Sequence, residues 1–216
     1  MHIEFLVEDS SGARAVENLI PRIIGQESMP HTWRIHKYKG VGTIPKGMSN
    51  ATDAAKRILL DNLPRLLGGY DKTPGIDAVV VIVDTDRHDC RAFLQELQSL
   101  SALTTRRVRV LFRLAIEEVE AWYLSDQAAV LAAYPSAKRQ VLNSYVPDSV
   151  CDTWETLADA VVVGGRAQVK ADGWPRSGEL KHEWAERITP LISIESNPSP
   201  SFQKFRNGLL RLVSGP

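Results

Sequence analysis

The sequence predicts an α/β fold, in which a mostly parallel β-sheet is flanked by helices and followed by a helical C-terminal elaboration. Short segments rich in β-branched residues alternate with segments of helical periodicity over about the first 134 residues. This alternation favours a parallel sheet, because parallel neighbours need crossover connections, which helices supply. Residues 76–83 form a nearly continuous apolar run, as expected of a strand buried on both faces.

The expected elements follow in order along the chain. Strands are expected where short apolar runs stand between polar turns, at residues 2–7, 32–38, 76–83 and 108–112. Helices are expected after each strand, over residues 15–23, 52–67, 89–100 and 117–124, and the Gly68-Gly69 pair is expected to end the second helix. Beyond Pro135 only helical segments are expected, at residues 152–161, 179–192 and 201–213. We therefore expect a sheet domain over residues 1–134 and a helical elaboration over residues 135–216 packed on it.

Composition excludes several classes of protein. The chain has 216 residues, and 26 basic residues balance 26 acidic ones, so net charge offers no attraction to nucleic acid and any such role depends on local patches. No apolar run approaches the roughly 20 residues of a membrane helix, and the N-terminus lacks a secretory signal, so we expect a soluble cytoplasmic protein. Cys90 and Cys151 are far apart, which argues against a zinc site or a disulfide framework.

Acidic residues stand directly after three of the expected strands. Glu8 follows the first, Asp84 and Asp86 follow the 76–83 strand, and Glu117 and Glu120 follow the last. Ligands of open α/β sheets bind at the carboxyl ends of the strands, so these acids are expected to converge on one crevice. Carboxylate oxygens are the ligands that Mg²⁺ prefers. The pattern predicts a metal site.

Each acid also has a purely structural interpretation. A carboxylate at a strand end is commonly a turn residue or the N-cap of the next helix, which would suit Glu8, Asp84 and Asp86. Glu117 and Glu120 lie three residues apart, so on a helix they would share a face, or they would form a favourable acidic first turn. The coincidence of acids at three strand ends favours the metal site, because clustered like charges are costly without a cation.

Basic residues concentrate in segments that lack acids. No acid occurs between Glu27 and Asp53, and none follows Glu195. Such segments could contact phosphates, or they could be ordinary solvated surface. The candidate nucleic-acid-binding residues are Lys37, Lys39, Lys46, Lys181, Lys204 and Arg206. The five tryptophans are interpreted as core or interface anchors rather than base-stacking platforms.

Two short motifs at strand ends resemble the Toprim domain, which type IA and type II topoisomerases, bacterial primases and OLD family nucleases share. These motifs are Leu6-Val7-Glu8 and the run from Val81 to Asp86, in that order across a strand-helix alternation. The segments 116–126 and 199–205 are similar to a prokaryotic Toprim-like family of unknown function. The resemblance implies a Toprim-like (Rossmann-like) fold, with a catalytic domain over residues 1–134.

The resemblance also implies a site and a chemistry. Glu8 would match the Toprim glutamate, a metal ligand or general acid/base, and Asp84 and Asp86 would match its metal-binding pair. Glu117 and Glu120 would match the extra acids of OLD-type nucleases. The implied activity is hydrolysis of DNA or RNA with Mg²⁺ or Mn²⁺, through a two-metal mechanism. A role in bacterial defence and an ABC-type ATPase partner are further implications.

Two alternatives to a nuclease stay open at this point. One is a non-catalytic or latent Toprim-like module that binds a partner ATPase or nucleic acid. The other is a phosphatase similar to haloacid dehalogenases, whose first aspartate is a nucleophile. That family has Thr or Val where this chain has His88, and it leaves Glu8 without a role. DNA or RNA, single or double strand, and a homo-oligomeric state are all left open.

Overall fold

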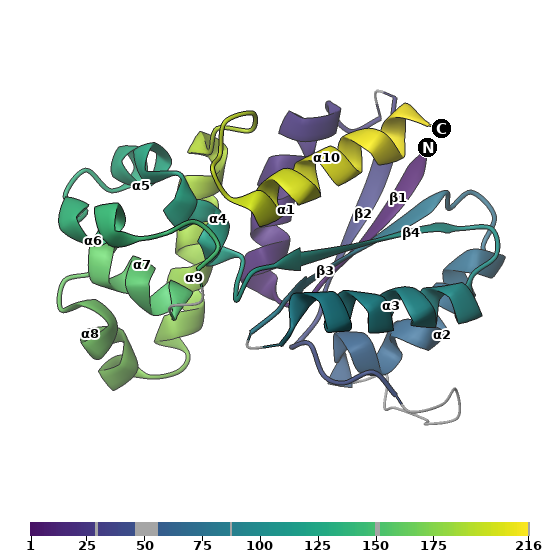
Figure 1. Ribbon diagram of the computed structural model, residues 1–216, viewed down its shortest axis with the longest axis horizontal. Helices are drawn as coiled ribbons and strands as arrows, with labels where there is room; N and C mark the ends of the chain where they lie inside the picture. The colour runs from purple at the N-terminus through teal and green to yellow at the C-terminus, as the bar shows by residue number, and fades with distance from the viewer. Residues whose placement is uncertain (29, 46–55, 87, 150–151, 216) are drawn as a thin grey trace.

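The protein has a four-stranded sheet in which every strand is parallel to its neighbours. The computed structural model describes residues 1–28, 30–45, 56–86, 88–149 and 152–215. The strands stand in the order β2-β1-β3-β4 and are β1 (His2–Val7), β2 (Thr32–Lys37), β3 (Ala78–Asp84) and β4 (Arg109–Ala115). Helices flank the sheet (Figure 1), so the predicted α/β, Rossmann-like class is confirmed.

The two central strands are buried on both faces. Side chains of β1 and β3 alternate between two separate cores, as a pleated strand requires. Phe5 and Val80 belong to the core on one face, whereas Leu6 and Val81 belong to the core on the other. This double burial explains why residues 76–83 form a continuous apolar run.

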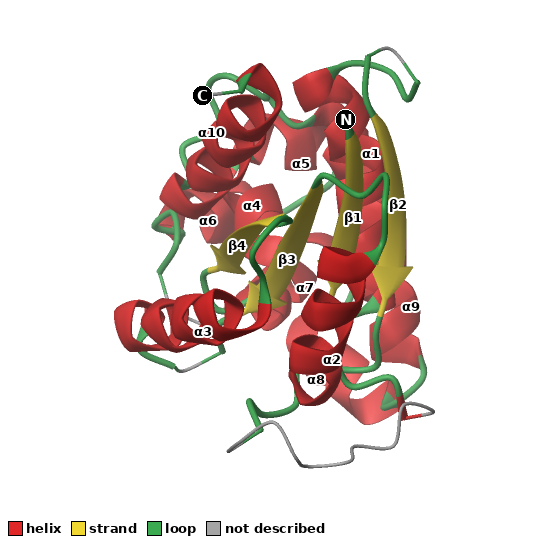
Figure 2. Cartoon of the chain, turned by 90° about the vertical axis from the view of Figure 1, so that its right-hand side faces the viewer, coloured by secondary structure: helices red, strands yellow, loops and turns green. Residues whose placement is uncertain are grey.

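Two helical layers cover the sheet. On one face lie α2 (Leu59–Lys72) and α3 (Cys90–Thr104), whose leucines and Phe93 pack on β3. On the other face lie α1 (Ser10–Ile24) and the C-terminal helix α10 (Pro200–Ser214), which packs against β4 and α1 (Figure 2). One face of the sheet is therefore covered by helices from the beginning and the end of the chain.

The segment between β4 and α10 forms a cluster of short helices beside the sheet (Figure 1). They are α4 (Glu120–Ser125), α5 (Gln127–Ala133), α6 (Arg139–Ser144), α7 (Thr153–Val161), α8 (Gly165–Asp172), α9 (Arg176–Ile188) and the 3₁₀ turn η2 (Thr189–Leu191). Their apolar side chains join the core of the α1 face, and α9 packs along α1. The helices after residue 134 thus share one continuous core with the sheet.

The segments 116–126 and 199–205 pack against each other. The Trp122 ring in α4 stacks on Phe205 of α10 with ring centroids 5.0 Å apart, and Trp122 Nε1 donates a hydrogen bond of 2.9 Å to Ser201 Oγ. Asn197 Nδ2 donates to the Trp122 carbonyl oxygen at 2.9 Å. These contacts therefore attach the helical cluster to the sheet.

Several expected helix boundaries were wrong. The helix α2 runs through Gly68 and Gly69 to Lys72, because neither glycine adopts the left-handed conformation that ends a helix, and it stops where Pro74 approaches. Its expected beginning, residues 52–55, lies outside the described residues. The short helices α5, α6 and α8 were not predicted, because six to eight residues carry too little periodicity to detect.

No helix in the described ranges has the length and apolar character to cross a membrane.

Candidate active site

The sheet has a topological switch point between β1 and β3. The chain leaves β1 through α1 to reach β2 on one side, and returns through α2 to β3 on the other side of β1. The carboxyl ends of two such strands leave a crevice, which is where ligands of open α/β folds bind. Glu8 follows β1 and Asp84 ends β3, so the two predicted site residues stand at this crevice.

A direct hydrogen bond joins these two strand ends. The Asp84 backbone N–H donates to Glu8 Oε2 at 3.1 Å. The next residue, Asp9, caps α1, because its Oδ1 accepts from the Gly12 N–H at 2.6 Å and its Oδ2 accepts from the Ser11 hydroxyl at 2.7 Å. Glu8 therefore sits on a short loop that is held by a sheet strand on one side and a capped helix on the other.

Hydrogen bonds join the loops after β3 and β4. Thr85 is central, because its N–H donates to the Ala115 carbonyl at 3.0 Å and its Oγ1 accepts from the Glu117 N–H at 2.8 Å. The Asp86 N–H donates to the Glu117 carbonyl at 3.0 Å. Asp86 and Glu117 both have left-handed backbones, with φ of 46° and 60°. With its backbone held in this way, Asp86 has an exposed side chain beside the crevice.

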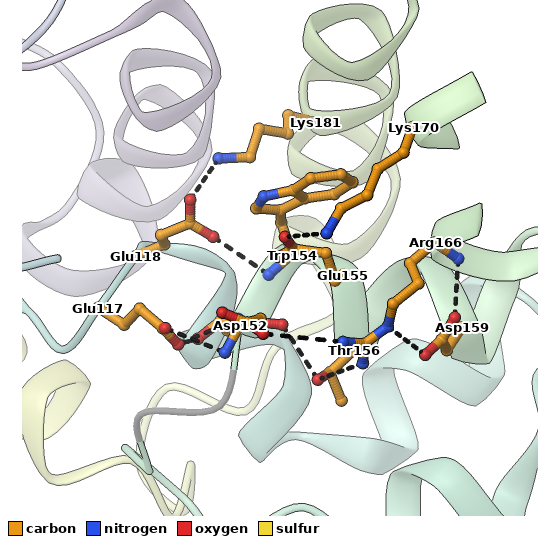
Figure 3. Close-up of polar contacts among 11 residues, drawn as sticks. Glu117, Glu118, Asp152, Trp154, Glu155, Thr156, Asp159, Arg166, Lys170 and Lys181 are labelled. Carbon is orange, nitrogen blue, oxygen red and sulfur yellow. Dashed lines mark hydrogen bonds and ion pairs between the residues drawn. The ribbon is translucent and has the colours of Figure 1, made fainter. Parts of the chain in front are cut away.

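The structure gives Glu117 a different position from the expected one. The helix α4 begins only at Glu120, so Glu117 precedes it and the two do not share a helix face. The Glu117 carboxylate accepts from the backbone N–H groups of Asp152 and Thr153, both at 3.0 Å, and from the Thr153 hydroxyl (Figure 3). The Glu117 carboxylate therefore caps the N-terminus of α7, where unpaired N–H groups favour an anion.

Lys181 of α9 enters the acidic site. Its Nζ lies 2.9 Å from Glu118 Oε1 and 3.8 Å from Glu120 Oε1. The other oxygen of Glu118 accepts from the Trp154 N–H at 3.1 Å, which links α9, α4 and α7 (Figure 3). Lys181 was predicted to bind nucleic acid, but in this structure its ammonium group is engaged with carboxylates.

Burial and mutual repulsion perturb the pKa values of these acids. Burial is the largest cause that raises the pKa of Glu8 to about 7, and Asp86 and Asp9 add to the rise. Burial and the nearby Glu8 raise the pKa of Asp84 well above its usual range. Burial raises the pKa of Glu120 to about 8, although Lys181 opposes the rise. Burial lowers the pKa of Lys181, but the carboxylates outweigh it and the net shift is upward. At neutral pH the site thus holds a protonated lysine and protons on part of its carboxyl groups.

The donor types at this site fit a divalent cation. Oxygen ligands, low exposure and more carboxylates than cations are what such an ion requires. Tyr123 adds a further polar group, since its hydroxyl is fully buried near Glu120 and Asp84 and has no hydrogen-bond partner among the described residues. Within the described ranges, however, no three His, Cys, Asp or Glu side chains form a ready metal-ligand set. The chemistry of the donors fits, whereas the side chains are not arranged as a closed coordination shell.

The raised pKa of Glu8 predicts a specific pH dependence of stability. Between pH 4.5 and about 7, the unfolded chain releases the Glu8 proton while the folded protein retains it, so stability falls as the pH rises through this window. Glu120 extends the loss to about pH 8. The fall is expected to be on the order of 1–3 kcal/mol in EDTA, and Glu8→Gln is expected to reduce it. Urea unfolding at pH 5, 7 and 8 measures it, with the exposed Glu96→Gln as control; equal slopes in wild type and Glu8→Gln would contradict the prediction.

A cavity of about 760 Å³ adjoins the acidic site. Asp9 and Lys181 belong to its wall, and Lys37 and Lys39 line it from the end of β2. Arg57, which the sequence did not single out, lies beside them. The structure therefore places Lys37 and Lys39 in one cavity with Asp9 and Lys181. Lys46 lies outside the described residues.

The last two candidate basic residues lie elsewhere. Lys204 lines a separate cavity of about 520 Å³ with His88 and Arg113. Arg206 faces Glu195, with Nη2 3.7 Å from Oε1, and donates to Asn207 Oδ1 at 2.9 Å. The structure thus does not gather all candidate cations on one surface.

Comparison with known families places the whole site within one match. The family described as Domain of unknown function (DUF4276) matches residues 7–210. The chain belongs to this family. In this DUF4276 chain the match runs from the last residue of β1 into α10, so it includes Glu8, Asp84, Asp86, Glu120 and Lys181. Searches of the curated proteins and of the solved structures find no significant match to it.

Sequence reasoning did not propose four members of this group as site residues of the DUF4276 chain. Glu118 and Tyr123 stand beside residues that were singled out, but helical spacing alone does not show which of them point inward. Arg57 and Trp174 carry no motif and reach the cavity only through the tertiary fold. The absence of any acid between Glu27 and Asp53 was the one available signal for the cavity, whose lining includes Lys37 and Lys39.

Proposed function

We propose that the acidic site is a divalent-metal-dependent centre that hydrolyses phosphodiester bonds in DNA or RNA, in the manner of the Toprim-type nucleases that its sequence resembles. The observation that carries the proposal is the contact between the half-buried Glu8 and Asp84 at the switch point, in a group of carboxylates that outnumber the lysines paired with them among the described residues. Such a group is costly unless a cation or protons neutralise it. Perturbed acids in a crevice are typical of catalytic sites.

Each residue has a role in this proposal. Glu8, Asp84 and Asp86 would hold Mg²⁺ or Mn²⁺, and a bound ion would supply an activated water and stabilise the leaving oxygen. Glu8 has a pKa of about 7, so it can accept or donate a proton at neutral pH. Glu120 and Lys181 would adjust the net charge of the site. Lys37 and Lys39 would bind phosphates in the adjoining cavity.

The direct test is cleavage by the purified full chain. Supercoiled plasmid, single-stranded DNA and RNA are incubated with Mg²⁺ or Mn²⁺, with EDTA as the metal-free arm. Asp86→Asn is expected to lose the metal-dependent cleavage, because the amide binds a hard cation poorly. Asparagine also tolerates the left-handed backbone at this position, where φ is 46°, so the variant is expected to fold.

The matched control is Asp152→Asn. Asp152 is also an exposed aspartate with a left-handed backbone, at φ of 57°, but it begins α7 rather than the acidic site. Full activity in Asp152→Asn with loss in Asp86→Asn supports the proposal. Metal-independent cleavage, or equal activity in wild type and Asp86→Asn, contradicts it.

A second candidate function is a latent module that becomes active only with a partner, such as an ABC-type ATPase. The position of Lys181 favours it, because this ammonium group already occupies the cationic role between Glu118 and Glu120. In that case the isolated chain is inactive, and a co-purified partner restores cleavage that remains sensitive to Asp86→Asn. The phosphatase alternative gains no support, because it gives no role to Glu8, whose carboxylate accepts a hydrogen bond from the Asp84 N–H.

A further inference from the structure

We infer that the 760 Å³ cavity binds an unstacked base and the neighbouring phosphates of a single-stranded nucleic acid, so that single strands are the preferred substrate. The inference rests on the proposed function for its catalytic meaning, but the binding site itself stands on separate observations. These are a cationic rim, two tryptophans in the same cavity, and a wall shared with the acidic site.

The cationic rim comes from the end of β2 and from the segment that precedes α2. Arg57 Nη2 donates to the Lys37 carbonyl at 2.5 Å, and the Lys39 N–H donates to the Arg57 carbonyl at 2.9 Å. These contacts hold three cationic residues together while their charges remain exposed. No carboxylate within the described residues pairs with Lys37 or Lys39. In a chain of zero net charge, this local excess indicates an anionic ligand.

Two tryptophans also line the cavity. Trp174 is 82% exposed, although a large apolar ring usually avoids water. Its ring lies on the first turn of α9, since a Cβ at Gly178 would stand only 2.5 Å from Trp174 Cζ3. Trp154 lines the same cavity, and its ring lies 5.8 Å from Lys170 Nζ. Trp174 is therefore exposed and does not belong to the core.

Cations beside exposed aromatic rings match single strands better than duplexes. An aromatic platform stacks on the face of a base, and that face is accessible only when the base has left its own stack. The cavity has the volume of a small-ligand site, so it suits one nucleotide rather than a double helix. A cationic track with stacking rings is the usual construction of single-strand binding sites.

The cavity is placed to deliver a phosphate to the acids. Asp9 and Lys181 line it, and both act electrostatically on Glu8 and Asp84. Gly40, which follows Lys39 and also lines the cavity, donates its N–H to the Glu8 carbonyl at 3.0 Å, so a phosphate held by Lys39 would lie near the end of β1. The site thus favours an accessible single-stranded segment over paired DNA or RNA.

The test measures binding of the full chain in EDTA, by fluorescence anisotropy of a labelled 12-nucleotide DNA strand and its RNA equivalent. The single strand is expected to bind more tightly than its duplex and than the free mononucleotide. Trp174→Ala is expected to weaken single-strand binding about tenfold, and Trp174→Phe to retain most of it. The control is Leu103→Ala, an exposed apolar residue at the end of α3.

Salt dependence tests the cationic rim. Lys37→Ala and Lys39→Ala are each expected to lower the slope of log affinity against log salt concentration by about 0.7, as one lost phosphate contact does on a single strand. Lys72→Ala, at the far end of α2, is expected to leave the slope unchanged. Unchanged affinity in Trp174→Ala, equal affinity for duplex and single strand, or equal affinity for the mononucleotide overturns the inference.

These measurements need neither metal nor cleavage, so they fail separately from the proposed function. A wild type that binds single strands through Trp174 but never cleaves contradicts the nuclease alone. A wild type that cleaves, while Trp174→Ala binds and cleaves normally, contradicts the single-strand site alone.

Discussion

Asp84→Asn is expected to lose metal-dependent cleavage by about a thousandfold or more, while the folded protein becomes more stable at pH 8 in EDTA. Asp84 lies at the end of β3, where burial and the nearby Glu8 raise its pKa. An ionised carboxylate there is repelled by its neighbours, so a neutral amide of the same shape relieves that repulsion. The same substitution removes a ligand for a hard cation. Opposite effects on activity and stability are typical of functional sites.

The measurement pairs an activity assay with thermal unfolding. Cleavage rates with Mg²⁺ and the Tm in EDTA at pH 8 are compared among wild type, Asp84→Asn and the exposed control Glu96→Gln. Mg²⁺ is expected to raise the Tm of wild type and not that of Asp84→Asn, because only the ionised site binds the ion. Lost activity together with a lower Tm would point to a structural role for Asp84 instead.

Lys181→Met is expected to destabilise the fold by about 3 kcal/mol at pH 8 and by much less at pH 5. At pH 8 the substitution leaves Glu118 and Glu120 buried without their cation, at distances of 2.9 and 3.8 Å in wild type. At pH 5 the carboxyl of Glu120 is protonated, because its pKa is about 8, and it needs no cation. The pKa of Lys181 is raised, so its stabilising contribution is present below the ordinary value of 10.5 wherever the carboxylates are ionised.

The matched control is Lys170→Met. Lys170 also forms a lysine–glutamate pair, with Glu155 at 3.1 Å, but its side chain is 55% exposed against 19% for Lys181. An exposed pair contributes at most about 1 kcal/mol, so the control is expected to change little at either pH. Adding Glu120→Gln to Lys181→Met is expected to recover part of the lost stability. Equal losses at pH 5 and pH 8 in urea unfolding would contradict the electrostatic explanation.

Much of the sheet could be predicted from the sequence. A strand buried on both faces must be apolar throughout, so the apolar run ending at Val83 was sufficient to locate β3. The juxtaposition of Glu8 and Asp84 was also predictable, because the carboxyl ends of parallel strands meet at one edge. Both predictions use local patterns and a geometric rule that holds for any parallel sheet.

The helical part and the fine geometry of the site were less predictable. Glu117 was expected on the same helix face as Glu120, but a left-handed backbone turns it toward α7. That conformation depends on the hydrogen bond from the Glu117 N–H to Thr85 and on the N-terminus of α7, which lies 36 residues along the chain. No local pattern carries this information.

Local sequence patterns are enough to predict the four strands and the helices between them along the chain, the double burial of β3, and the position of Glu8, Asp84 and Asp86 at strand ends. These follow from periodicity, which neighbouring residues already contain. Three features depend on the tertiary fold: Lys181 neutralises Glu118, Glu117 caps α7, and Trp174 lines the same cavity as Lys37 and Lys39. Charge pairing and burial act through space, so the partners of a side chain are set by the packing of distant segments and not by its neighbours in the chain.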